Sequence, residues 1–286
     1  MMSIVNRFAR VLPDKLYIEM MFFRHFGYFA RINAPRTFNE KLQWLKLYDH
    51  NPLYTTMVDK VKAKDYVASI IGSQHIIPTL GVWESAESID FSSLPNQFVI
   101  KCNHDSHGVI VCSDKTQINE EMIRQKLERR LNSSGYYYGR EWPYKNVEKR
   151  IIAEEFISDG TGELSDYKVH CFGGVPKVIL VCRDRFSEAG LKEDFYDTNW
   201  NHLEVGRPGT PHGSSMPRPD ALEEMLGLAE CLSRDIPFLR TDFYCVHGKV
   251  LFGELTLFPA SGFTPFVPHD FDKTMGEWLS LPGQMR

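Results

Sequence analysis

One segment near the carboxyl end restricts the fold of this chain more than any other. Residues 238–256 alternate or run apolar on both sides of His247-Gly248, and this pattern predicts a β-hairpin with a tight turn at those two residues. Residues two apart in a strand point to the same face, so Arg240 and Asp242 project together. Strand pairing can bring Glu254 beside them. The sequence pattern therefore predicts that two carboxylates and a guanidinium lie close together on this hairpin.

Two interpretations of this convergence are open at the level of the hairpin itself. Carboxylates are among the ligands that Mg²⁺ prefers, and an arginine can stabilise the charge that develops during phosphoryl or acyl transfer. A structural ion pair between Arg240 and either carboxylate uses the same residues without any chemistry. The choice between the two depends on what the rest of the chain carries.

Composition excludes several classes of protein. The chain has 286 residues and a net charge of −4, which gives no electrostatic case for nucleic acid as the main partner. No apolar run approaches the roughly 20 residues needed to cross a bilayer, and charged residues interrupt the N-terminus where a signal peptide would be apolar. The six cysteines include no CxxC pair, which is typical of reduced, buried thiols. We therefore expect a cytoplasmic protein, whose oligomeric state the composition leaves unknown.

Residues 1–94 are predicted to form a helical N-terminal region. Thr37 and Glu40 have the spacing of a capping box, which would begin a helix that runs to Tyr48. Pro52 can open a further helix that continues until Gly72 ends it. The first 36 residues are basic and aromatic, so they either pack against the core or lie on an anionic membrane surface.

Strand patterns begin after residue 95. Residues 97–102 and 109–112 are predicted strands, joined by a small polar loop over 103–108. Backbone N–H groups of such a loop can face phosphate, with Lys101 supplying a point charge. A rival interpretation is a zinc site formed by Cys102, His104, His107 and Cys112. Their spacing does not match a standard zinc finger, and strand alternation would separate them.

Three further strands are predicted before the hairpin, over residues 150–157, 166–172 and 177–183. A helix that ends at Ser233 then leads into the hairpin. Each strand by itself is compatible with plain sheet core. Such a core does not explain the order of charged residues along these strands.

Taken in order, the charged residues resemble the ATP-grasp fold, an α+β fold in which two lobes hold a nucleotide between them. They are Asp59, Lys60, Lys101, Glu154, Glu155, Asp166, Arg240, Asp242 and Glu254. More narrowly, the segments 36–48, 94–106, 166–168 and 252–262 look like the TupA-like branch, which is associated with teichuronopeptide and other surface-polysaccharide synthesis. This resemblance implies a helical region over 1–94, a small lobe over 95–157 and a large lobe with the metal site over 158–286.

The resemblance implies a set of phosphate contacts. Lys60 and Lys101 would contact the phosphates of ATP. The polar loop, which includes Ser106 and Gly108, would close over them. These residues would together form the cofactor-binding side of the small lobe.

The resemblance also implies where the nucleoside lies. Glu154 would be near the adenine amino group, and backbone groups from Glu155 to Ile157 would meet the edge of the adenine. Asp166 takes the place of the acidic residue that binds the ribose hydroxyls. Glu163 is close enough in sequence to compete for that role.

Asp242 and Glu254 would hold Mg²⁺, and Arg240 would stabilise the transferring phosphate or a tetrahedral intermediate. Thr256 stands where the amino-acid ligases of this fold usually carry an asparagine. A hydroxyl coordinates a cation more weakly than an amide carbonyl does. The number of metal ions therefore stays open between one and two.

A second departure concerns a phosphate-binding lysine. Residues 194–200 look like the strand and turn that bring this lysine in the ligases, but no lysine follows. Lys168, Arg183 and Arg185 are the candidates to replace it. Helices take the place of the N-terminal lobe of the longer ligases, so the acceptor site cannot be transferred from them. The segment 183–217, which contains many Gly, Pro, Ser and His residues, is predicted as a mobile acceptor-binding loop.

The resemblance implies an ATP- and Mg²⁺-dependent carboxylate–amine ligase in cell-surface polysaccharide synthesis. A sugar acid would be phosphorylated to an acyl phosphate, which an amine or amino acid would attack to form an amide. The reaction would take place in the cytoplasm or at the inner face of the membrane. Two alternatives stay open. One is a glycosyltransferase that uses a nucleotide sugar and the Asp-x-Asp pattern of Asp270 and Asp272, and the other is a non-catalytic nucleotide-binding scaffold.

Overall fold

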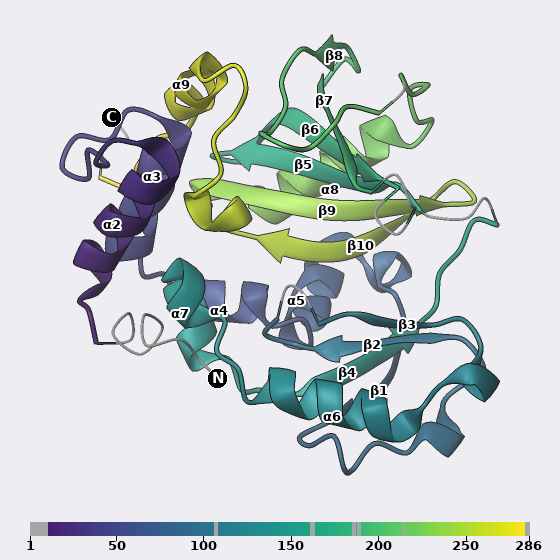
Figure 1. Ribbon diagram of the computed structural model, residues 1–286. Coiled ribbons are helices and arrows are strands. Elements are labelled where there is room, and N and C mark those ends of the chain that lie inside the picture. Colours follow the sequence, from purple (N-terminus) through teal and green to yellow (C-terminus); the bar gives the residue numbers. More distant parts are fainter. Residues whose placement is uncertain are drawn as a thin grey trace.

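The computed structural model describes residues 11–105, 108–160, 164–184, 187, 190–213 and 215–283. Two antiparallel sheets lie one above the other, and α4 and α5 lie between them (Figure 1). Helices α2 and α3 stand at one side of the six-stranded sheet, and α6 lies on the outer face of the four-stranded sheet. This arrangement is the predicted α+β fold of two lobes with N-terminal helices.

The larger sheet has the strand order β10-β9-β5-β6-β7-β8. Its strands are β5 Asp166–Phe172, β6 Val175–Arg183, β7 Lys192–Asp197, β8 His202–Leu203, β9 Phe238–Val246 and β10 Lys249–Thr256. The predicted hairpin is confirmed as β9 and β10. Its turn residues His247 and Gly248 both have positive φ, 49° and 77°, which is the backbone conformation of the tightest hairpin turns.

The smaller sheet has the strand order β1-β4-β2-β3. Its strands are β1 Thr79–Trp83, β2 Phe98–Cys102, β3 Ile110–Cys112 and β4 Ile151–Glu155. The strand β1 lies within the region 1–94 that we predicted as helical, and it corrects that prediction there because it pairs with β4 along the edge of this sheet. Its residues are exposed or half-exposed and its register shifts between Thr79 and Gly81, so the local sequence shows no clear alternation.

Eight helices are described in the ranges given above, together with short 3₁₀ turns. They are α2 Asp14–Phe26, α3 Phe38–Tyr48, α4 Leu53–Val58, α5 Lys62–Ile71, α6 Glu120–Leu131, α7 Tyr136–Gly139, α8 Leu222–Ser233 and α9 Asp270–Trp278. The capping box at α3 is confirmed, because the Thr37 and Glu40 side chains each accept a hydrogen bond from the other's backbone N–H. None of these described helices is long and apolar enough to span a membrane.

A break separates α4 from α5 where we predicted one continuous helix over residues 52–71. Asp59 leaves the helical conformation (ψ 106°), and its Oδ1 accepts a hydrogen bond of 2.9 Å from the N–H of Val61 at the start of α5. Aspartate side chains compete with the helical backbone in this way. Asn103, just after β2, donates to the same oxygen at 2.8 Å, and its carbonyl accepts from the N–H of Lys60 at 3.1 Å. The break therefore ties Lys60 to the small sheet.

Two separate apolar cores support the sheets. The larger core contains residues of the six-stranded sheet and its helices, such as Phe243, together with Met57 of α4 and Val67 of α5. The smaller core contains Phe98 of β2 and Leu127 of α6. Although α4 and α5 precede the small sheet in the chain, they pack into the larger core. The break between them consequently lies in the space between the two sheets (Figure 1).

Candidate active site

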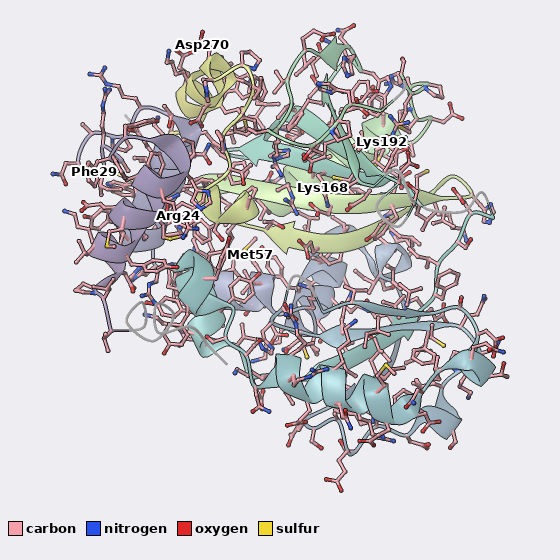
Figure 2. All side chains as sticks on the ribbon, viewed as in Figure 1. Arg24, Phe29, Met57, Lys168, Lys192 and Asp270 are labelled. Atoms are coloured by element: carbon pink, nitrogen blue, oxygen red, sulfur yellow. The ribbon has the colours of Figure 1, made fainter. Side chains whose placement is uncertain are left out.

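Strand register sets two rows of polar side chains across β5, β9 and β10. One row contains Lys168, Asp242 and Glu254, and the next contains His170, Arg240 and Thr256. Residues directly opposite each other in an antiparallel pair share a face of the sheet. All six side chains therefore leave the same face. In Figure 2, Lys168 lies on this sheet.

Asp242 is enclosed by cations. Arg240 donates two hydrogen bonds to its carboxylate, from Nε to Oδ1 and from Nη2 to Oδ2, each of 2.7 Å. The Nζ of Lys168 lies 2.5 Å from Oδ2 of Asp242 and also contacts Asp166. Burial alone would lower the pKa of Lys168, but the carboxylates of Asp242 and Asp166 raise it above its usual value. Lys168 is therefore charged at neutral pH.

Glu254 is held by three donors. Nη2 of Arg240 lies 3.3 Å from its Oε1, Nζ of Lys60 lies 3.3 Å from its Oε2, and the Thr256 hydroxyl donates to Oε1 at 3.0 Å. Burial would raise the pKa of Glu254, but Lys60 and Arg240 hold it well below its usual value. The carboxylate is therefore ionised. Asp242, Glu254 and Thr256 offer an all-oxygen donor set, which fits Mg²⁺, a hard cation.

We call Lys60, Asp166, Lys168, Arg240, Asp242 and Glu254 the cation–carboxylate cluster. It has three cations and three carboxylates, so its formal charges cancel. Because every carboxylate already contacts at least one cation, the cluster can release cations to a new anion whenever a metal takes over the carboxylates.

The facing wall of the site comes from the small sheet and α5. Glu154 of β4 is buried between two lysines: Lys64 lies 2.6 Å from its Oε1, and Lys101 contacts its Oε2. Burial would raise the pKa of Glu154, but Lys101 and Lys64 lower it below its usual value. Our sequence analysis missed Lys64. In the continuous helix that we predicted, Lys64 stands four residues after Lys60 on the same face, a spacing that we did not use.

A narrow, partly open cavity lies between the two walls. Its apolar lining comes from Met57, Val58, Ala63, Phe252 and Leu255, and its charged lining from Lys60, Lys64, Lys101, Glu154 and Glu254. Met57 of α4 is labelled in Figure 2 beside the six-stranded sheet. The lining therefore combines an apolar surface with both cations and carboxylates.

The sequence profile of the TupA-like ATPgrasp family matches residues 40–280. The chain belongs to the TupA-like ATP-grasp family. This membership confirms the family resemblance and the ATP-grasp fold predicted from the sequence, and it supports the predicted ligase class. A comparison with curated protein sequences found no match.

Solved structures with similar folds are ligases of low sequence identity. The D-alanine–D-alanine ligase from Bacillus anthracis is 15% identical, with 71% of this chain and 57% of that chain covered and a TM-score of 0.42. The same ligase from Helicobacter pylori is 16% identical, with 86% and 69% covered and a TM-score of 0.44. The ATP-grasp ligase PsnB, complexed with a phosphomimetic variant of minimal precursor, Mg and ADP, is 10% identical, with 77% and 57% covered and a TM-score of 0.42. The chain thus spans just over half the length of the first of these ligases.

Not every predicted site residue of this TupA-like ATP-grasp protein reaches the cluster. Arg183 does not, because its neighbour Cys182 is paired with Asp166 and shares the cluster face. The next residue along a strand points to the other face. Arg183 there lies 2.7 Å from Asp194. Arg185, the third candidate to replace the missing lysine, lies outside the described residues.

The predicted nucleotide loop is described only at its two ends. Ser106 lies outside the described residues, whereas Gly108 is buried where the loop returns to β3. Asp105, before the gap, forms an ion pair with Arg130 of α6. This ion pair anchors the base of the loop to a helix of the small lobe.

Two of the predicted adenine contacts lie at the end of β4. The N–H of Glu155 donates to the carbonyl of Pro78 at 3.0 Å, so this donor is already used. The side chain of Glu155 is exposed, and Ile157 is half-buried just beyond the strand. The Glu155 carbonyl and the backbone of Ile157 remain the predicted contacts for the adenine edge.

The structure adds an arginine that the sequence did not single out. Arg207 lies 3.5 Å from Oε1 of Glu193, and its side chain is 15% exposed. Glu193 pairs with Cys182, so it leaves β7 on the cluster face. Burial lowers the pKa of Arg207, and the nearby charge of Arg240 lowers it further. No spacing in the sequence indicates that this loop residue reaches the site.

His170 is a third residue that the sequence analysis missed, after Lys64 and Arg207. Its Nδ1 lies 3.0 Å from the carbonyl oxygen of Lys168, and because a carbonyl only accepts, Nδ1 carries the proton and Nε2 the lone pair. Burial, Arg240 and Arg207 hold the pKa of His170 well below its usual value. The imidazole is therefore neutral beside the guanidinium of Arg240.

The Asp-x-Asp pattern does not form a metal site. Asp272 is buried and accepts hydrogen bonds of 2.9 Å from both the backbone N–H and the Nδ2 of Asn39, which joins α9 to α3. Asp270 is exposed and pairs with Lys273 (2.6 Å) at the outer end of the molecule, remote from Lys168 (Figure 2). The two carboxylates therefore serve different purposes.

The rival zinc set also fails among the residues that the structure describes. The buried thiols of Cys102 and Cys112 donate to backbone carbonyls, at 3.7 and 3.6 Å, and His107 lies outside the described ranges. The cysteines are free, and four of the six are buried. The described part of the chain contains one cluster of three potential metal-binding side chains, and it lies elsewhere.

Proposed function

We propose that this protein is an ATP- and Mg²⁺-dependent ligase that joins a carboxylate to an amine through an acyl phosphate. The observation that carries the proposal is the convergence of Lys168, Arg240, Asp242 and Glu254 on one sheet face. Lys60 contacts Glu254, and the cavity that these two residues line is also lined by Lys101. A structural ion pair would need only two of these residues. Cations and carboxylates gathered on one face are what binding of phosphate and a metal ion uses.

Charge supports ATP as the ligand of the cavity. The two walls together carry five cations, which are Lys60, Lys64, Lys101, Lys168 and Arg240. They also carry four carboxylates, which are Glu154, Asp166, Asp242 and Glu254. Asp242 and Glu254 would hold Mg²⁺, which when bound neutralises phosphate charge. Lys60 and Lys168 can then turn from these carboxylates to phosphate oxygens.

The chain's own residues supply the remaining chemistry. Arg240 lies where it can stabilise the oxyanion that forms when an amine attacks the acyl phosphate. His170, next to it in the row, offers Nε2 as the acceptor for the proton that the amine loses. Anionic phosphate beside Arg240 would offset the positive charge that depresses the pKa of His170. That shift brings the imidazole closer to the pKa of an effective base.

We propose a sugar acid as the carboxylate substrate and cell-surface polysaccharide synthesis as the setting. Arg207 supports an acidic substrate, because a guanidinium on the cluster face suits a carboxylate. It belongs to the segment 183–217 that we predicted to bind the acceptor. An amine or amino acid would be the second substrate.

A titration of thermal stability tests nucleotide binding, using ATP, UDP-glucose and UDP-glucuronic acid, each with and without Mg²⁺. A ligand at about 100 times its Kd stabilises the folded state by roughly 2.7 kcal/mol. We expect Mg²⁺-dependent stabilisation by ATP, lost in Lys101→Ala and retained in Lys126→Ala, whose lysine is exposed on α6. Stabilisation by a UDP-sugar and not by ATP would instead favour the glycosyltransferase.

Hydroxylamine tests the acyl phosphate directly. With ATP, Mg²⁺ and uronic acids as candidate substrates, we expect ADP release and a hydroxamate that mass spectrometry detects. ATP binding without hydroxamate or amide from any acid would favour the nucleotide-binding scaffold over the ligase.

We also propose that the N-terminal helix region contacts an anionic membrane surface from the cytoplasmic side. Exposed apolar side chains gather there at Leu16, Met20, Phe23 and Phe29. Figure 2 shows Phe29 and Arg24 at the outer surface of the molecule. The protein should sediment together with vesicles of phosphatidylglycerol. The double variant Phe23→Ser/Phe29→Ser should not. Equal binding to neutral phosphatidylcholine vesicles would contradict the charge-based part of the proposal.

A further inference from the structure

Three metal-binding side chains meet on the face of the six-stranded sheet that is turned away from the cation–carboxylate cluster. Cys182 faces the cluster and pairs with Glu193, so the next residue in β7, Asp194, points to the other face. β8 begins at His202, and the loop that follows it returns through His212. Three separate stretches of the chain thus converge on Asp194.

The distances between these side chains are those of a metal coordination shell. Oδ1 of Asp194 lies 3.3 Å from Nε2 of His202 and 3.4 Å from Nδ1 of His212, and the three atoms lie within 4.8 Å of one another. Zinc bonds of about 2.0–2.1 Å in a tetrahedron place neighbouring ligand atoms roughly 3.3–3.4 Å apart. The His202 contact is also a hydrogen bond, longer than the usual length of about 2.7–3.2 Å for N–H···O bonds.

The surrounding groups orient these side chains. Arg183 donates to Oδ2 of Asp194 at 2.7 Å, and the N–H of Gly213 donates to the same carboxylate at 3.0 Å. The same N–H also lies 3.2 Å from Oδ1, the oxygen that the two imidazoles approach. Nδ1 of His202, the nitrogen turned away from Asp194, lies 3.6 Å from a carboxylate oxygen of Glu204. Metal-binding histidines typically donate that second N–H to a carboxylate, and Glu204, whose side chain is 94% exposed, lies within reach of this role.

From this geometry we infer that Asp194, His202 and His212 bind a divalent transition metal ion of the zinc type. Two imidazoles and one carboxylate suit Zn²⁺ and disfavour Mg²⁺, which takes oxygen ligands. The histidine side chains are 31% and 44% exposed, whereas that of Asp194 is 1% exposed. Water can therefore reach the fourth coordination position from the solvent side.

The metal would close the loop between its two histidine ligands. That loop carries Arg207, which crosses the sheet edge to Glu193 on the cluster face. Backbone hydrogen bonds of 2.8 and 2.9 Å between Gly206 and Val267 hold its middle. Zinc would hold the two ends of this loop, at His202 and His212, and so fix the position of Arg207. The metal site itself does not depend on the proposed ligase reaction.

Zinc binding is measured on tag-free full-length protein that has been treated with a chelator and returned to buffer with excess Mg²⁺, which occupies oxygen-only sites. We expect one Zn²⁺ per chain by calorimetry, and Co²⁺ should give the visible absorption of a tetrahedral site. His202→Ala and His212→Ala should each weaken zinc binding by at least about 100-fold. His269→Ala, at an exposed histidine, should bind as the wild type does.

Two results would overturn the inference. One is the absence of stoichiometric zinc binding by the wild type. The other is zinc binding that both histidine substitutions leave unchanged while Glu254→Gln removes it, which would place the ion in the cation–carboxylate cluster. Far-ultraviolet circular dichroism of each variant shows that the fold is retained. Magnesium-dependent ATP binding, measured separately, distinguishes failure of this site from failure of the proposed function.

Discussion

Single side chains in the cluster act through charges that cannot be removed independently. Arg240 contacts both Asp242 and Glu254, and Lys168 contacts both Asp242 and Asp166. Removing one partner of a buried ion pair leaves the other charge uncompensated, which costs more than the pair itself contributes. Substitutions that keep shape but remove charge therefore report best on function.

Glu254→Gln should lower ATP-dependent turnover by more than about 10²-fold, because a ligand for the catalytic metal is lost. The amide keeps the size of the side chain and its contact with Thr256. ADP release measured over a range of Mg²⁺ concentrations checks this. Glu230→Gln, at an exposed position on α8, is the control. Near-normal turnover in Glu254→Gln would remove Glu254 from the metal site.

Glu154→Gln should destabilise the protein by about 3 kcal/mol at pH 7, because Lys64 and Lys101 lose their shared carboxylate. The folded-state pKa of Glu154 lies below its usual 4.5, so its stabilisation is present above that pH and is lost as pH falls. The difference in free energy of unfolding between wild type and variant should therefore shrink below about pH 4.5. Urea unfolding at several pH values measures it.

The exposed neighbour provides the control for this pH experiment. Glu155→Gln removes the same charge from the same strand without a buried lysine pair, so its free energy of unfolding should stay within about 0.5 kcal/mol of the wild type. A gap for Glu154→Gln that does not change with pH would contradict the assigned ion pairs.

At the scale of elements, α3 and α9 form a clamp at one end of the large sheet. Asp272 at the start of α9 accepts two hydrogen bonds from Asn39 in the first turn of α3. Lys41 of α3 donates to the carbonyls of Gly276 and Leu279 at the end of α9, both at 2.7 Å. Helices α3 and α9 lie near the two ends of the family domain. Their contacts therefore close this domain around the large core.

Asp272→Ala should destabilise the protein by about 1–3 kcal/mol, because the buried N–H of Asn39 loses its acceptor. Asp270→Ala should change the free energy of unfolding by less than about 0.5 kcal/mol, since its side chain is solvated. Chemical denaturation of both variants measures the difference. Both variants should still bind ATP with Mg²⁺. Loss of nucleotide-sugar binding in both variants would instead support the glycosyltransferase alternative.

At the scale of the whole molecule, two cores are joined through one polar space. The small core of the four-stranded sheet shares no buried residue with the core of the six-stranded sheet. Between them lie the cavity and the helix break that carries Lys60. A ligand that contacts both walls would therefore strengthen the polar link that Lys60 already makes between the two sheets.

Leu127→Ala removes a fully buried side chain from the small core and should cost about 2–5 kcal/mol there. Hydrogen exchange should accelerate in β1 to β4 and α6, while amides of β5, β6 and β9 keep their protection. Mg²⁺ and ATP should partly restore protection to the small lobe. Uniform loss of protection in both sheets would show that the two cores unfold as one.

Features that depend on neighbours in the chain were predictable from sequence. The hairpin follows from alternation on both sides of His247-Gly248, and the capping box from Thr37 and Glu40. Period-two alternation also placed Arg240 and Asp242 on one face, as observed. The family resemblance extended this to an ordered set of charged residues, most of which the fold brings to the two walls of one cavity.

Only the tertiary structure decided which face each remaining residue occupies. Arg183 was a candidate by proximity in sequence, yet it points away from the cluster, while Arg207 reaches it from a loop. The strand β1 is recognised only through its partner β4. The physical reason is that register depends on strands distant in the chain, and a shift of one residue moves a side chain to the opposite face.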